Sequence, residues 1–161
     1  MSDDIAQQLE SLLLAEQDVL LQLQQTLEQE SRALLDRDIK TIDETAKNKR
    51  QLLLTFEKQV GSRQDYLSTH SVTADEDGLK SLIDQQGSNK KDNLITLWNT
   101  IRALFSQVIT LNEENGIVIQ HSRLRTRNLL NILHADRIQP NLYNEKGSAK
   151  DSSGSHKLGK A

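Results

Sequence analysis

Apolar residues recur at steps of three and four over the first third of the chain, which is the spacing of one face of an α-helix. From about Asp3 to Leu35 this stripe consists of Ile5, Leu9, Leu12, Leu20, Leu23, Leu27 and Leu34. Glu16 and Glu30 occupy the two gaps in it. A second stripe consists of Ile39, Ile42, Ala46, Lys49, Leu53, Phe56, Val60, Arg63 and Leu67. The pattern predicts two long amphipathic helices, over residues 3–35 and 39–67.

The segment Asp36-Arg37-Asp38 separates the two stripes, so the two helices are predicted to form an antiparallel hairpin over residues 3–67. Asp36 or Asp38 is expected to cap the second helix, because an Asp side chain accepts hydrogen bonds from free N–H groups at a helix start. Each arm holds about 30 residues and is roughly 45 Å long. Glu16 and Arg63 lie at similar distances from the turn, so we expect them to pair and to fix the register of the hairpin.

The periodicity lapses over residues 68–92, which are predicted to form a connector. The acidic run that ends at Gly78 and the segment Gly87-Ser88-Asn89 are both interpreted as breaks, because Gly and small polar residues favour turns. Between these breaks, one or two helical turns are expected around Leu79, Leu82 and Ile83. The connector is therefore predicted to contain a short helix.

A third periodic stretch begins near Asn93. Its stripe consists of Leu94, Leu97, Trp98, Ile101, Leu104, Phe105, Val108, Leu111, Asn115, Val118 and Ser122. A helix over residues 93–136 holds about 44 residues and is roughly 65 Å long, some 20 Å more than an arm of the hairpin. The alternative is a turn at Asn115-Gly116, after which residues 117–133 fold back as a fourth helix. The first interpretation places residues 1–136 in one helical bundle, followed by a flexible basic tail over residues 137–161.

The end of the third helix is the main indication of function. The stretch from Leu124 to Leu133 also contains Leu129, Leu130 and Ile132, and its consecutive apolar pairs point around more than one narrow stripe. A hairpin that is too short to cover these side chains leaves them in water, at about 1.5–3 kcal/mol for each large one. Large exposed apolar patches on soluble proteins usually mark a site for a partner.

Composition favours the same all-α fold class, an elongated three-helix bundle. The 161 residues include 26 Leu and 15 Gln but only 5 Val and 5 aromatic residues, a bias that favours helices over strands. The net charge of −3 does not indicate a nucleic-acid-binding protein, and the absence of Cys excludes disulfides. The acidic start lacks the features of a signal peptide, and no apolar run approaches the length of a membrane span. We therefore expect a cytoplasmic protein with no nucleic acid partner and no membrane insertion.

No constellation of catalytic, metal-binding or cofactor-binding residues is apparent, so the chain is not expected to be an enzyme. None of the four His residues follows a Glu by three positions, which excludes the ligand pattern of di-iron helical bundles. Histidine phosphotransfer through His121 or His134 is a minor alternative. Arg123, Arg125 and Arg127 form a basic patch, which we interpret as a solvated helix face or a surface for an acidic partner.

The ordered set of these features resembles the FlgN family of flagellar type III export chaperones over residues 5–147. The resemblance depends on the Leu-rich first helix and on three spacings, Glu30 to Leu34 to Asp38, Lys49 to Leu53, and Arg63 to Leu67. It depends most on the end of the chain, where Arg127, Leu130, Leu133, Leu142, Tyr143 and Gly147 follow in order.

The resemblance implies a cytoplasmic chaperone that binds the helical terminal segments of hook–filament junction proteins, prevents their premature assembly and delivers them to components of the export gate. It implies a cargo site at Leu129, Leu130, Ile132, Leu133, Leu142 and Tyr143. The competing interpretation is a structural protein or adaptor, a coiled-coil homodimer in which the exposed helix ends associate with each other.

Overall fold

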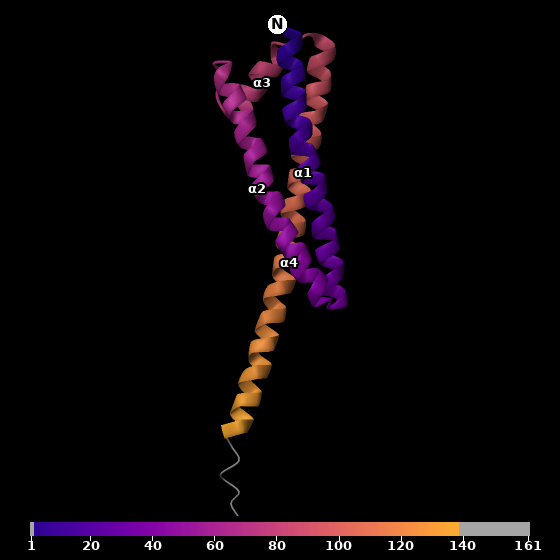
Figure 1. Ribbon diagram of the computed structural model, residues 1–161, viewed down its shortest axis with the longest axis vertical. Helices are drawn as coiled ribbons and strands as arrows, with labels where there is room; N and C mark the ends of the chain where they lie inside the picture. Colours follow the sequence, from indigo (N-terminus) through magenta and orange to yellow (C-terminus); the bar gives the residue numbers. More distant parts are fainter. Residues whose placement is uncertain (1, 139–161) are drawn as a thin grey trace, which may run out of the picture. The chain divides into compact units, whose positions relative to one another are not determined.

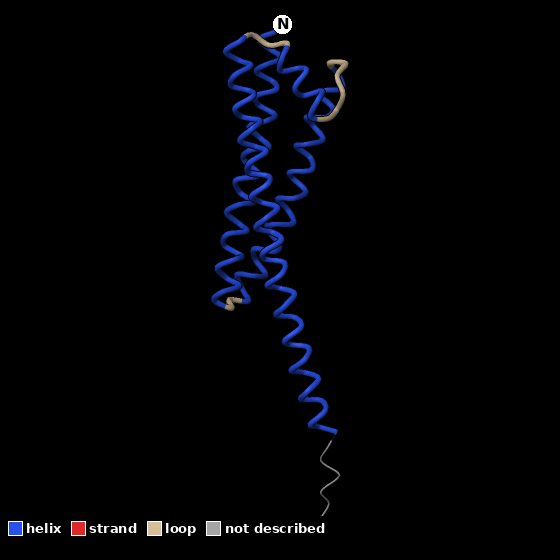
Figure 2. Tube along the Cα trace, turned by 180° about the vertical axis from the view of Figure 1, so that it is seen from behind, coloured by secondary structure: helices blue, strands red, loops and turns tan. Residues whose placement is uncertain are grey.

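The computed structural model describes residues 2–138, with side chains from residue 4 to residue 132, and this part of the chain contains helices and no strands. The helices are α1 (Ser2–Asp36), α2 (Ile39–Thr69), α3 (Glu76–Asp84) and α4 (Ser88–Ile138) (Figures 1 and 2). The predicted all-α fold is confirmed. The contacts between backbone segments divide the chain into two units, of which the first ends at Ser122 and the second begins at Arg123. We call residues 2–122 the bundle and residues 123–132 the C-terminal stretch.

The predicted hairpin of α1 and α2 is confirmed, and Asp38 is the residue that caps α2. Its carboxylate accepts hydrogen bonds from the backbone N–H of Thr41 at 3.2 Å and from the Thr41 hydroxyl at 2.6 Å. These hydrogen bonds lower the pKa of the Asp38 carboxyl. Arg37 has a φ of 56°, and this left-handed residue turns the chain so that the N–H of Asp38 donates to the carbonyl of Ala33 at 2.9 Å. The turn is tight because only these two residues lie between the helices.

Helix α1 lies at the centre of the hydrophobic core of the bundle. Its fully buried leucines are Leu9, Leu13, Leu20, Leu23 and Leu27. From the other helices, the core also contains Leu67, Leu79, Leu82, Ile83, Leu94, Ile101, Leu104 and Val108. Helix α2 buries only Thr45, Arg63 and Leu67, and the stripe residues Ile39 and Leu53 are exposed. A helix at the side of a bundle buries only the positions that face its neighbours, and these two side chains lie outside that face.

The short helix of the connector is confirmed, but it begins earlier than expected because Gly78 lies inside its first turn. Asp75 caps α3 by accepting a hydrogen bond from the N–H of Gly78 at 2.9 Å. A Cβ atom at Gly78 would come within 1.7 Å of the carbonyl oxygen of Thr73, so the close approach of the backbone requires glycine at this position. The interpretation of Gly78 as a break is therefore wrong, and the buried face of α3 closes one end of the bundle (Figure 1).

Helix α4 begins at Ser88, several residues before the predicted start, and continues to Ile138. The alternative of a turn at Asn115-Gly116 is wrong, because the helix passes through both residues. A helix of 51 residues compares with 35 residues in α1 and 31 in α2, so the expected excess length of the third helix is confirmed. The boundary at residue 136 stays a prediction, and the tail predicted for residues 137–161 lies almost entirely outside the described residues.

Among the described residues, α4 is the one helix that is long and apolar enough to cross a membrane by length and composition. A core helix of a soluble protein passes the same test, so this finding is weak evidence for a membrane span. In the bundle, α4 buries Leu94, Ile101, Leu104 and Val108 against the other helices. Only 17% of the apolar window that passes this test is buried, so packing inside the bundle covers a small part of it.

Candidate functional site

Two ion pairs join the arms of the hairpin, one buried and one partly buried. Arg63 Nε donates to Glu16 Oε1 at 2.6 Å, and the two side chains are only 9% and 1% exposed. Lys49 Nζ donates to both carboxylate oxygens of Glu30 at 3.0 Å. The predicted pairing of Glu16 with Arg63 is confirmed. Both pairs specify the same register, because the acids are 14 positions apart on α1 and the bases are 14 positions apart on α2.

Burial controls the chemistry of the Glu16 carboxyl. Its removal from water raises the pKa of Glu16 above the usual value, and the hydrogen bond and charge of Arg63 offset only part of this increase. The ion pair is therefore costly to bury as well as difficult to break, and its value is in specifying one alignment of the two helices. Glu16 is held against Arg63 inside the bundle, so it is not arranged for acid–base chemistry on a substrate.

Asn115 extends the second ion pair to α4. Its side-chain amide donates to Glu30 Oε2 at 3.0 Å and to the backbone carbonyl of Leu27 at 2.9 Å. The amide, the carboxylate and Lys49 therefore connect three helices in one buried polar cluster. From the sequence, Asn115 is a residue of the α4 stripe or the start of a turn, and neither interpretation identifies this cluster. A polar residue on an apolar helical stripe, like Glu30 on α1, is the signal that could have located it.

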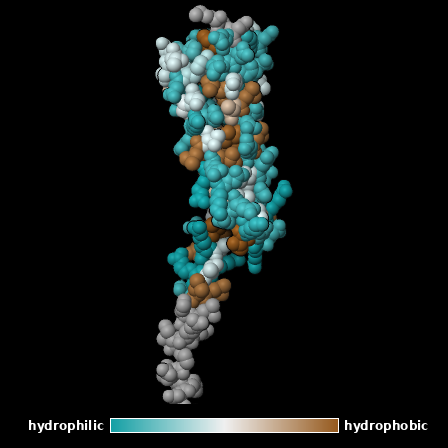
Figure 3. Space-filling view, viewed as in Figure 1, coloured by the Kyte–Doolittle hydropathy of each residue, from teal (hydrophilic) through white to brown (hydrophobic). Residues whose placement is uncertain are grey.

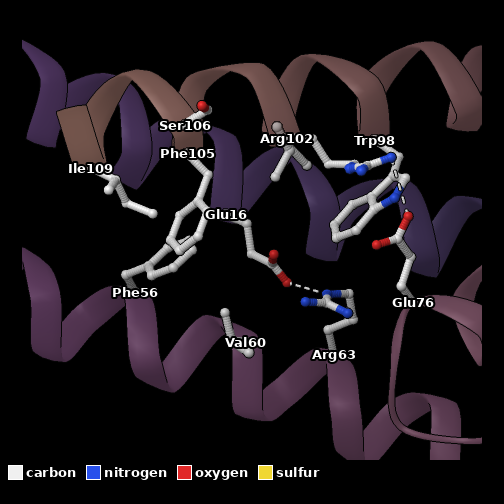
Figure 4. A pocket seen from close by; sticks show the side chains of 11 residues that line it. Glu16, Phe56, Val60, Arg63, Glu76, Trp98, Arg102, Phe105, Ser106 and Ile109 are labelled. Carbon is white, nitrogen blue, oxygen red and sulfur yellow. Dashed lines mark hydrogen bonds and ion pairs between the residues drawn. The ribbon is translucent and has the colours of Figure 1, made fainter.

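A groove of about 540 Å³ lies between α2 and α4, with Glu16 of α1 at its floor (Figure 4). The guanidinium of Arg63 lies 5.1 Å from the ring centroid of Trp98, in cation–π geometry. Phe56 and Phe105 stack with their centroids 5.7 Å apart. Sequence reasoning did not identify this groove, although the doubled apolar positions at residues 97–98 and 104–105 show that α4 has a wider apolar face.

Hydrophobic side chains gather on one face of the bundle, where they interrupt a mainly hydrophilic surface (Figure 3). The exposed large apolar residues of the bundle include Leu53, Leu54, Ile95, Phe105 and Ile109. Within the described residues, no group of three or more His, Cys, Asp or Glu side chains is placed to hold a metal ion. The groove can accept apolar groups, and its charged lining residues are paired with each other, Glu16 with Arg63 and Glu76 with Arg102.

The predicted cargo residues lie in or beyond the C-terminal stretch. Leu129, Leu130 and Ile132 are 61%, 50% and 59% exposed, and Leu124 is also exposed. Leu133 lies in α4, whereas Leu142 and Tyr143 lie outside the described residues. The structure therefore places four of the six residues on one continuous helix and leaves three described apolar side chains in water. Arg123, Arg125, Arg127 and His121 are exposed as well.

The family and the fold of this chain are shared with known proteins. The model of the FlgN protein family matches residues 1–151. The chain belongs to the FlgN family. Among solved structures, the bundle is similar to the crystal structure of a flagella synthesis protein FlgN from Pseudomonas aeruginosa, with a TM-score of 0.63 and 23% sequence identity. The similarity covers 78% of this chain and 95% of the other, which supports the FlgN fold. No curated protein matches this chain significantly in sequence.

Membership of the FlgN family indicates the general role of the chain. FlgN proteins are soluble chaperones of flagellar export rather than enzymes, so the chain is a flagellar chaperone that binds flagellar proteins. The family does not support histidine phosphotransfer through His121 or His134. The residues that contact a client are not identified by the family match.

Proposed function

We propose that this chain binds the helical terminal segments of hook–filament junction proteins, prevents their premature assembly and delivers them to components of the flagellar export gate. The cargo site in this proposal consists of Leu129, Leu130, Ile132, Leu133, Leu142 and Tyr143. FlgN family membership supports the chaperone role. The single observation that supports the position of the site is the exposure of three large apolar side chains in the C-terminal stretch.

The exposed residues are a source of binding free energy. Covering one large apolar side chain is worth about 1.5–3 kcal/mol, so Leu129, Leu130 and Ile132 together can stabilise a complex with a second amphipathic helix. Such a helix would lay its apolar face on α4, with contacts repeating every three or four residues. Because soluble proteins rarely leave such residues uncovered together, a protein partner explains their presence.

The affinity expected from this mechanism is moderate. A cargo segment that is disordered when free must lose conformational entropy when it forms a helix on α4. This cost lowers the affinity below the value that the buried area alone would give. A chaperone that releases its cargo at the export gate benefits from this reduction. Leu142 and Tyr143 would add contacts from the part of the chain beyond α4.

The test is a double variant, Leu129→Asp with Leu130→Asp, measured by calorimetry against the terminal segment of a hook–filament junction protein. We expect binding to be lost, because each substitution places a charge in the proposed apolar contact. The matched control is Leu53→Asp with Leu54→Asp, a consecutive pair of exposed leucines on α2 that should leave binding unchanged. Circular dichroism of both variants checks that the helices remain. Undiminished binding of the first variant would reject the site.

A truncation after Ala135 tests the contribution of Leu142 and Tyr143 separately. We expect it to weaken binding less than the double Asp variant does, because it keeps the exposed side chains of α4. Binding equal to that of the full chain would remove these two residues from the proposed site while leaving the α4 contacts in place.

A further inference from the structure

Charge is distributed unevenly along the chain, and all the charged side chains of the C-terminal stretch are positive. Between Glu114 and Asp136 the sequence contains no Asp or Glu, although the whole chain has 23 acidic residues and a net charge of −3. Arg123, Arg125 and Arg127 lie within this interval, and all three are exposed. The ion pairs of the described residues join other side chains and include none of these arginines.

The fold of this chain does not require these charges. Arg123 and Arg127 are four positions apart on one helix, where two like charges repel each other. The negative end of the helix dipole does not explain them, because its effect is limited to the last turn and α4 continues to Ile138. Nor is there an acidic residue within helical reach on either side of Arg125. The positive charge is therefore available to a partner.

The apolar residues of the same stretch indicate what kind of partner this is. At 3.6 residues per turn, Leu124, Leu129 and Leu130 point in directions about a third of a turn apart. A helix that lies on a membrane surface instead needs one apolar face and an opposite polar face. The interval from Asn115 to Ala135 also contains no Phe, Tyr or Trp on which a nucleic acid base could stack. These features favour a protein partner over a membrane surface or a nucleic acid.

We propose that the C-terminal stretch recognises an acidic amphipathic helix. The apolar stripe of this partner would pack on Leu129, Leu130 and Ile132, and Asp or Glu residues beside the stripe would pair with Arg123, Arg125 and Arg127. Arginine suits this contact because its planar guanidinium can donate two parallel hydrogen bonds to one carboxylate. The inference rests on the proposed function, because it defines the chemistry of the segment that occupies the same site.

Charges at the rim of an interface act mainly by accelerating association, and salt weakens them. We therefore expect the wild-type chain to bind the junction-protein segment about tenfold more slowly when NaCl increases from about 50 mM to about 300 mM. The variant Arg123→Gln with Arg125→Gln and Arg127→Gln should bind at least about tenfold more weakly at low salt, with a much smaller salt dependence. The matched control replaces Arg32, Arg37 and Arg50, three exposed arginines of the hairpin, with Gln and should behave like the wild type.

A second experiment uses synthetic peptides, so that the preference for an acidic helix is tested without a hook–filament junction segment. Two synthetic helical peptides share one Leu stripe, which is flanked by Glu in one peptide and by Lys in the other. Stronger binding of the Glu peptide, lost in the triple Gln variant, supports an acidic partner even where the junction segment does not bind. Equal binding of the two peptides overturns the inference. If Leu129→Asp with Leu130→Asp still abolishes binding in that case, the apolar site of the proposed function stands.

A membrane surface is tested in the same series. Vesicles of phosphatidylglycerol and phosphatidylcholine are sedimented with the wild-type chain and with the triple Gln variant. Binding to vesicles that depends on the three arginines, together with no preference for the Glu peptide, would assign the positive charge to anionic lipid and overturn the inference. Absence of vesicle binding, together with a preference for the Glu peptide, supports an acidic helix.

Discussion

The bundle and the C-terminal stretch share one helix but place similar side chains in opposite environments. In the bundle, α4 buries Leu94 and Ile101 against other helices of the same chain. In the C-terminal stretch, the same helix exposes Leu130 and Ile132. The side chains are similar in size and hydropathy, so composition does not separate the two regions. The bundle buries part of its apolar area in its own core and leaves other apolar side chains, such as Ile95 and Ile109, exposed, whereas no side chain of the C-terminal stretch is buried.

The charged residues of the two regions also differ in burial and in pairing. In the bundle, the charges on apolar stripes are paired, the buried Glu16 with Arg63 and the buried Glu30 with the partly buried Lys49. In the C-terminal stretch, the arginines are exposed and carboxylates are absent from the neighbouring sequence. A pair within the chain specifies its register, while a charge without a pair can specify a partner.

The largest expected loss of stability comes from a substitution that breaks the Glu16–Arg63 ion pair of the bundle. Arg63→Ala leaves the buried Glu16 carboxylate without its cation, which we expect to destabilise the fold by about 3–5 kcal/mol. Thermal unfolding followed by circular dichroism measures the loss. As a control, Glu16→Leu with Arg63→Met removes both charges and should restore most of the stability, because apolar residues of similar size can replace a buried ion pair. A fold that tolerates Arg63→Ala unchanged would show that the pair is dispensable.

The next effect compares one leucine from each region. Leu20→Ala creates a cavity in the core of the bundle and should destabilise it by about 2–5 kcal/mol. Leu130→Ala removes an exposed side chain and should change stability by no more than about 0.5 kcal/mol, while it weakens cargo binding. Urea unfolding of both variants, measured under the same conditions, makes the comparison. Similar losses of stability would mean that Leu130 packs within the folded protein.

The smallest effect concerns Asn115, which anchors α4 beside the point where the two regions meet. Asn115→Ala removes the hydrogen bonds to Glu30 and to the Leu27 carbonyl, so two buried acceptors lose a donor. We expect a loss of about 1–3 kcal/mol in the free energy of unfolding. Hydrogen exchange should then increase first in α4 around residue 115. Protection equal to that of the wild type would indicate that water replaces the amide.

Much of the fold was predictable because it follows from local periodicity and constant helical rise. The hairpin, the Asp38 cap and the Glu16–Arg63 pair all depend on counting positions from one tight turn. Periodicity could not predict that Gly78 and Gly116 lie inside helices rather than at breaks between them. Gly78 is required because the Thr73 carbonyl lies where its Cβ atom would be. Helix α4 passes through Gly116 because the adjacent Asn115 is held by α1. Both contacts form between parts of the chain that meet only after folding.

The candidate site was predictable in part for a related reason. The apolar residues and arginines of the C-terminal stretch are visible in the sequence, but their exposure is a property of the packed structure. The amino-acid sequence alone determined that the chain forms helices, where the hairpin turns and that Glu16 pairs with Arg63 across it, because these features depend on spacing. Only the tertiary structure decided which leucines are covered and where a groove forms between α2 and α4. Burial depends on every neighbour that folding brings into contact, and no local pattern contains that information.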